Sequence, residues 1–122
     1  MLIINLRHMI ELGCLALVMY MESSISSVTT QAYVASVVIE RAKQDKQTIC
    51  KNIHRPISYS WMFDGKNTKV DQLFLHQKLY PIALAQLKKP RLVGYYYFNE
   101  CRLGKRFKTK NKMIRSDTMC FY

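Results

Sequence analysis

Glu22 stands at the end of an apolar run and is the residue best suited to acid/base chemistry. Seven uncharged residues, Leu15–Met21, precede it without a break, and the small or apolar segment Ser23–Ser26 follows it. A carboxyl group in such surroundings is poorly solvated, which disfavours its charged form and raises its pKa. A carboxyl group that stays protonated near neutral pH can act as a general acid. The alternative is an ordinary surface glutamate at the frayed end of a helix.

A second candidate site is the cluster Ser58-Tyr59-Ser60-Trp61, which combines aromatic rings with hydroxyl groups. This composition suits sugar binding, because an aromatic ring can stack on the apolar face of a pyranose. The alternative is that Trp61, the one tryptophan of the chain, belongs to the core, since tryptophan is usually largely buried.

A third candidate is the segment Gly94–Asn99, in which three tyrosines and a phenylalanine are consecutive. Alternation along a strand places Tyr95 and Tyr97 on one face, and Tyr96 and Phe98 on the other. One face then packs on the core and the other is free to line a cleft. Consecutive tyrosines of this kind more often serve packing than a site.

The chain of 122 residues has 19 basic and 8 acidic residues, a formal net charge of +11. Its length predicts one domain over residues 1–122. The charge indicates an anionic partner, which is nucleic acid, a membrane surface or an acidic polymer such as the bacterial cell wall. No segment resembles a transmembrane helix or a clear signal peptide, because Arg7, His8 and Glu11 interrupt the first apolar run.

The segment Cys101–Arg115 contains seven lysines or arginines. Such a run is usually a solvated face, but it could bind phosphate backbones or hold an enzyme on an anionic wall. Phe107 alone interleaves with its charges, which is weak support for a platform that stacks single-stranded bases. Glu100 and Asp117 flank the segment and are expected to pair within it.

The four cysteines show no spacing typical of a metal site, so we expect neither a metal nor a cofactor. Cys14 lies in an apolar helix and is expected to behave as a small hydrophobic residue, while disulfide pairing stays open.

The expected fold is α+β and mainly helical, with a small β element at the C-terminus. The predicted helices are 7–22, Gln31–Gln44 after an N-cap at Thr29 or Thr30, a turn at Thr48–His54, and Thr68–Lys89 divided at Pro81; the predicted strands are Leu92–Asn99 and Thr118–Tyr122, paired together. In the second helix, Glu40 and Arg41 are expected at the surface.

These segments carry a resemblance to the SleB-like cell wall hydrolases, which include the spore-cortex-lytic enzymes and their phage relatives. The family pattern C-L-A-L-x-x-Y-x-E resembles Cys14–Glu22, and the later G-Q-x-A-V-A-x-V-V-L-N-R resembles Gln31–Arg41. Its Cys, Q-F-S-W and D-G block is similar to Cys50, Ser58–Trp61 and Asp64-Gly65, and its G-A-x-H-Y-H and H-x-F-Y blocks are similar to Gly94–Asn99 and Met119–Tyr122. The blocks keep their order over about residues 12–122.

The resemblance implies a compact lysozyme-like or lytic-transglycosylase-like domain that cleaves peptidoglycan glycan strands. Glu22 matches the family's catalytic acid. It would protonate the glycosidic oxygen and then draw a proton from the sugar's own 6-hydroxyl, a route that needs one carboxylate where common hydrolysis uses two. Muramidase and lytic transglycosylase activities both stay open. The residues that would line the glycan cleft are Ser58, Tyr59, Trp61, Tyr97 and Asn99.

The chain also departs from the family. The A-R-G-E that follows the catalytic acid is replaced by Ser23–Ser26, the glutamine of Q-F-S-W by Ser58, and two histidines by Tyr97 and Asn99. Losing the second acid favours a one-carboxylate mechanism, but also fits an inactive wall-binding relative. The small size and missing signal suggest a phage protein, either virion-associated or held in the host cytoplasm before release to the wall. The rival hypothesis is a basic nucleic-acid-binding module that uses Lys105–Arg115.

Overall fold

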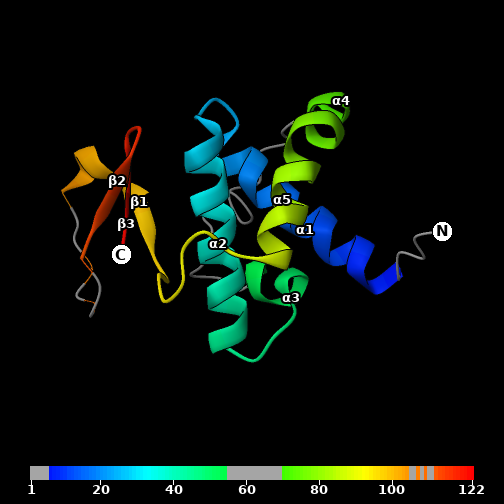
Figure 1. Cartoon of the computed structure of the whole chain (residues 1–122), viewed down its shortest axis with the longest axis horizontal. Coiled ribbons are helices and arrows are strands. Elements are labelled where there is room, and N and C mark those ends of the chain that lie inside the picture. The colour runs from blue at the N-terminus through cyan, green and yellow to red at the C-terminus, as the bar shows by residue number, and fades with distance from the viewer. Residues whose placement is uncertain (1–5, 55–69, 105–106, 108, 110–111) are drawn as a thin grey trace.

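The computed structural model describes residues 6–54, 70–104, 107, 109 and 112–122, and shows a helical body with a small sheet against one side (Figure 1). The elements are α1 (Leu6–Ser23), α2 (Val28–Gln44), α3 (Ile49–Ile53), α4 (Gln72–Phe74), the π-helical η2 (Leu75–Leu79), α5 (Tyr80–Lys88), β1 (Phe98–Glu100), the 3₁₀ turn η3 (Cys101–Leu103), β2 (Ile114–Ser116) and β3 (Met119–Phe121). The prediction of a mainly helical α+β chain with a small C-terminal sheet is confirmed.

Helices α1 and α2 form the centre of the core. Leu15 and Val18 of α1, and Val34 and Val38 of α2, are fully buried, as the apolar pattern of both helices predicts. Helix α2 begins earlier than predicted, because its N-cap is Ser27 and not Thr29 or Thr30. The Ser27 side chain accepts a hydrogen bond from the backbone amide of the third residue of the helix.

The helical run that contains Pro81 is continuous from Gln72 to Lys88, so the prediction of two separate segments is wrong. Proline clashes with the carbonyl one turn earlier in a regular α-helix. Here the preceding turn is π-helical, with the Tyr80 amide bonded to the carbonyl of Leu75. The wider turn ends just before Pro81, which stands in the first turn of α5 as predicted.

The three strands form an antiparallel sheet in the order β1-β3-β2. Asn99 of β1 and Arg115 of β2 both face Cys120 of the central strand. The predicted pairing of the two apolar segments is therefore confirmed. The first strand is shorter than predicted, because Gly94 has a φ of +79° and turns the chain before β1. Strand β2 begins at the end of the basic segment, where no strand was predicted.

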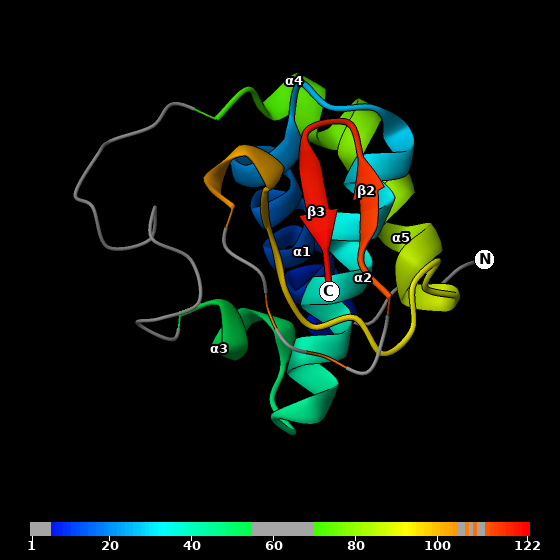
Figure 2. The same ribbon diagram turned by 90° about the vertical axis from the view of Figure 1, so that its left-hand side faces the viewer.

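The sheet lies against α2, on the side away from α5 (Figure 1). Phe121 of β3 is fully buried, and its ring meets Tyr33 of α2 edge to face at 5.5 Å between centroids. Figure 2 shows β2 and β3 in front of α2, and the linker from α5 crossing it to reach β1.

This linker explains why Glu40, which was expected at the surface, is only 8% exposed. Its carboxylate accepts a hydrogen bond from the Gly94 amide at 3.2 Å and lies 3.9 Å from the Lys43 ammonium. Nearby, the Ser36 hydroxyl donates to Gln86 and accepts from the Arg91 amide, both at 3.1 Å. The polar side of α2 is therefore covered by the linker.

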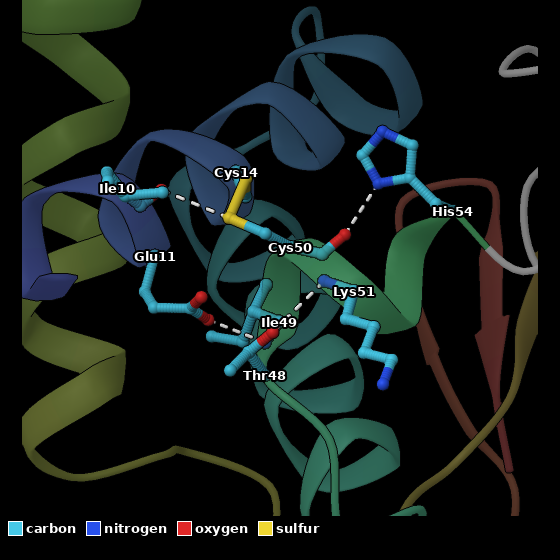
Figure 3. Close-up of a disulfide and its surroundings, with 8 residues drawn as sticks. All are labelled: Ile10, Glu11, Cys14, Thr48, Ile49, Cys50, Lys51 and His54. Carbon is cyan, nitrogen blue, oxygen red and sulfur yellow. Dashed lines mark hydrogen bonds between the residues drawn. A yellow bond between two sulfur atoms is a disulfide. The ribbon is translucent and has the colours of Figure 1, made fainter.

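Cys14 forms a disulfide with Cys50, so the expectation that it is merely a small hydrophobic residue is wrong (Figure 3). The bond joins α1 to α3. Beside it, the Glu11 carboxylate accepts a hydrogen bond from the Ile49 amide at 2.5 Å, and the Cys50 sulfur lies 3.3 Å from the carbonyl oxygen of Ile10. The short helix α3 is thus attached to the middle of α1 both covalently and by a cap.

A second disulfide, Cys101–Cys120, joins the end of β1 to β3. All four cysteines are therefore paired. No helix in the described ranges has both the length and the apolar character to cross a membrane.

Candidate functional site

Glu22 is the penultimate residue of α1 and is half-buried. Four of the seven residues before it are fully buried: Leu15, Ala16, Val18 and Met19. The next residue, Ser23, is also buried, and its hydroxyl donates to the carbonyl of Met19 at 2.9 Å. Glu22 therefore belongs to the last turn of a helix that the core holds firmly.

The chain reversal after Glu22 is fixed from inside by Gln31. This side chain is 4% exposed, and its Nε2 donates to the carbonyls of Ser23 at 3.2 Å and Ser24 at 3.4 Å. The Ser26 amide closes the turn by donating to the Ser23 carbonyl at 3.0 Å. Gln31 therefore sets the path of the backbone next to the candidate acid.

The same loop is fixed from outside by Asp117, at the turn between β2 and β3. Its Oδ2 accepts hydrogen bonds from the Ser27 amide at 2.9 Å, the Ser27 hydroxyl at 2.7 Å and the Thr30 hydroxyl at 2.5 Å. The hydrogen bonds from Thr30 and then Ser27 hold the pKa of Asp117 below its usual range. The expectation that Asp117 pairs within the basic segment is wrong, because it binds the start of α2.

A hollow of about 390 Å³ is lined by residues of this loop, of the start of α2 and of the helical run from α4 to α5. Its lining residues are Ser24, Ser26, Val28, Gln31, Phe74, Gln77, Lys78 and Ile82. The helical side of the hollow is fixed to α1 by Tyr20. The Tyr20 hydroxyl accepts from the Asp71 amide at 3.1 Å, and its ring meets Phe74 edge to face.

Of the residues predicted to line a glycan cleft, Ser58, Tyr59 and Trp61 lie outside the described residues. Tyr97 and Asn99 come from the start of the sheet, whereas Glu22 comes from α1. The structure links the sheet to the loop after Glu22 through hydrogen bonds of Ser27 and Thr30 with Asp117.

Tyr97 is 39% exposed and stacks on Phe107, with ring centroids 4.6 Å apart and an interplanar angle of 5°. One face of the Tyr97 ring is therefore covered, so a sugar could stack only on the other face. Phe107 also meets Tyr122 edge to face at 5.4 Å. It packs the basic segment onto the sheet, which weakens its interpretation as a platform for nucleic-acid bases.

A second hollow, of about 330 Å³, is lined by Glu100, Cys101, Arg102, Arg115 and Thr118. The Arg102 Nε donates to the Glu100 carboxylate at 2.6 Å, which confirms that Glu100 pairs within the basic segment. In the part of the chain that the structure describes, no group of three or more His, Cys, Asp or Glu side chains could hold a metal ion.

The sequence reasoning missed the two residues that fix the loop beside Glu22, Gln31 and Asp117. Gln31 is part of the motif similar to the cell wall hydrolases, so that motif was a usable signal. Asp117 carries no local signal, because its partners lie near residue 30.

Compared with known proteins, the chain matches no family model, no curated protein and no solved structure.

Proposed function

We propose that this protein cleaves the glycan strands of peptidoglycan, with Glu22 as its single acid/base, and that its fold is a divergent lysozyme-like domain. One observation carries the proposal: Glu22 is half-buried at the end of a buried helix, where Gln31 and Asp117 hold the following loop. A catalytic acid needs such a rigid position to meet the glycosidic oxygen at a fixed distance. The motifs shared with the SleB-like hydrolases supply the substrate class.

The other described carboxylates each have a structural role. Six of the remaining seven are used in caps, clamps or ion pairs: Glu11, Glu40, Asp45, Asp71, Glu100 and Asp117. The seventh, Asp64, lies outside the described residues. A mechanism with one carboxylate therefore fits this chain better than the usual hydrolysis with two.

In the proposed reaction, the Glu22 carboxyl donates its proton to the oxygen of the scissile glycosidic bond as that bond breaks. The resulting carboxylate then takes a proton from the 6-hydroxyl of the same sugar, whose oxygen attacks the anomeric carbon and forms a 1,6-anhydro ring. If water attacks instead, the carboxylate takes the proton from water and the product is a reducing sugar. Glu22 is ionised after the first proton transfer and protonated again after the second, so the acid is regenerated.

The two disulfides and the net charge support an action outside the reducing cytoplasm. Structural disulfides persist mainly in oxidising compartments. A formal charge of +11 attracts the protein to an anionic wall. We accordingly propose a phage protein that reaches the wall on release from the host cytoplasm or with the virion.

The test is to incubate wild type and Glu22→Gln with purified sacculi and analyse the released fragments by mass spectrometry. We expect Glu22→Gln to release fragments at least about 100-fold more slowly, because a positioned general acid typically contributes 10²–10⁴-fold. Glu100→Gln, at the exposed end of the sheet, is the matched control and should cleave like wild type. Equal release by Glu22→Gln and wild type contradicts the assignment. The fragment masses distinguish anhydro from reducing ends.

The same samples separate the two alternatives. A wall-binding relative without activity would sediment with sacculi but release no fragments. A nucleic-acid-binding module would bind duplex DNA tightly at low salt, weaken steeply as salt rises, and leave sacculi intact. The stacking of Phe107 on Tyr97 disfavours base stacking by the basic segment.

A further inference from the structure

The hollow beside the Glu22 loop has two walls of different character. One wall is the loop and first turns of α2, which contribute Ser24, Ser26 and Gln31. The other wall is one face of the helical run, where Phe74, Lys78 and Ile82 recur every four residues. Each wall is anchored independently, the first by hydrogen bonds of Gln31 and the second by Tyr20. The hollow is thus formed by the fold and not by a chance arrangement of surface side chains.

The second wall of the hollow contains the π-helical turn that precedes Pro81. Lys78 and its neighbour Gln77 both belong to η2 (Leu75–Leu79), where one residue more than usual is accommodated in a turn. Both residues lie three and four positions after Phe74, and they line the hollow together with it. Single π turns inside α-helices occur frequently at functional sites.

The lining chemistry matches an N-acyl sugar that carries one negative charge. Val28, Phe74 and Ile82 offer apolar surface for a sugar face or an acetyl methyl group. The hydroxyl and amide side chains of the lining can donate to and accept from sugar hydroxyls and the acyl amide. Lys78 is the one charged residue among the described residues that line the hollow, and its charge favours an anion. The volume of about 390 Å³ lies within the range of roughly 300–1,000 Å³ typical of small-molecule sites.

We propose that this hollow is a subsite for one sugar unit of the glycan strand, and that Lys78 binds the carboxylate which that unit carries. The inference rests on the proposed function. The carboxylate could come from the lactyl group of the sugar or from the peptide attached to it. The hollow is lined by Ser24 and Ser26 of the loop that follows Glu22, so a sugar bound there would lie next to the candidate acid in sequence.

The test measures binding in the Glu22→Gln background, so that ligands stay intact, by titration calorimetry. The ligands are soluble glycan strands stripped of peptide, strands with peptide, and uncharged chitin oligosaccharides. We expect Lys78→Gln to weaken binding of the carboxylate-bearing strands about 2- to 5-fold, the effect of one exposed ion pair, and to leave chitin binding unchanged. Lys88→Gln removes the same charge from the same helical run, ten residues further on, and should change nothing.

A second variant, Gln77→Trp, fills the hollow and should weaken all three ligands. If Lys78→Gln loses affinity only for strands with peptide, the carboxylate belongs to the peptide. If it loses affinity for both kinds of strand, the carboxylate belongs to the lactyl group. Equal binding by Lys78→Gln, Gln77→Trp and the background protein overturns the subsite, even if wild type cleaves sacculi. If wild type does not cleave but Lys78→Gln still weakens strand binding selectively, the subsite stands and the assignment of Glu22 as acid fails.

Discussion

The Asp117 carboxylate accepts a hydrogen bond from the Ser27 amide at 2.9 Å, although 90 residues separate the two in sequence. Ser27 is the N-cap of α2 and follows Glu22 by one loop. Through this contact, the turn of the C-terminal hairpin fixes the start of α2. The small sheet is therefore more than a cover for the core, because it also supports the loop beside the candidate acid.

We predict that acidification lowers the thermal stability of wild type more than that of the Asp117→Asn variant. Folding lowers the pKa of Asp117 through hydrogen bonds from Thr30 and Ser27, whereas in the unfolded chain it titrates near about 3.9. The stabilisation is therefore complete above the unfolded pKa and is lost as the pH falls from about 4 through the lower folded pKa. Thermal midpoints measured from pH 7 to pH 2.5 report this loss.

Asparagine is the informative replacement, because Asp117 has a φ of +53° and asparagine tolerates this left-handed conformation. The variant should be less stable than wild type at pH 7, and its midpoint should fall less on acidification. Parallel curves for the two proteins would show that Asp117 contributes nothing to the acid dependence.

Replacing Gln31 by methionine should lower both stability and cleavage. Methionine has a similar size but cannot donate to the carbonyls of Ser23 and Ser24. Because this site is buried, we expect a loss of about 1–3 kcal/mol in the free energy of unfolding, measured by urea titration. Gln44→Met, at the exposed end of α2, is the matched control. An unfolding curve for Gln31→Met that coincides with wild type would contradict a positioning role.

The parts of the fold that the sequence predicts are those with strong local patterns. The long apolar run before Glu22 predicts a buried helix, and Thr48 predicts the short turn that it does cap. Pro81 was expected to divide its helix, since proline disrupts a regular α-helix. The π turn before Pro81 avoids that clash, and no local pattern announces it.

Long-range contacts explain the remaining errors. Glu40 looks like a surface residue in its own helix, but it is covered by a linker that starts 50 residues later and turns at Gly94. Similarly, the pairing of Cys14 with Cys50 depends on α3 packing against α1, which spacing alone does not specify. In the candidate site, the sequence predicts Glu22 from pattern and resemblance, whereas the contact of Asp117 with the loop depends on the folded hairpin.

A double-mutant cycle should detect coupling between Ser36 and Gln86. The two side chains bond to each other at 3.1 Å, and each accepts from the Arg91 amide. Because they share a partner, the effects of Ser36→Ala and Gln86→Leu should not add, and the interaction energy should lie within about 0.5–3 kcal/mol. Urea titrations of the two single variants and the double variant measure it. Additive effects would mean that the network does not hold the linker to α2 as a unit.

Breaking the two disulfides should destabilise the protein to different extents. The Cys14–Cys50 bond spans 36 residues and the Cys101–Cys120 bond spans 19. From the loss of chain entropy in the unfolded state, the first bond is expected to stabilise the fold by about 4 kcal/mol and the second by about 3 kcal/mol. We therefore expect Cys14→Ala/Cys50→Ala to have a lower urea midpoint than Cys101→Ala/Cys120→Ala, and dithiothreitol to lower the wild-type midpoint below both.

Since the first bond holds α3 to the helix that carries Glu22, its loss should also slow sacculus cleavage. A wild-type midpoint that is unchanged by reductant would show that the bonds do not stabilise the fold in solution.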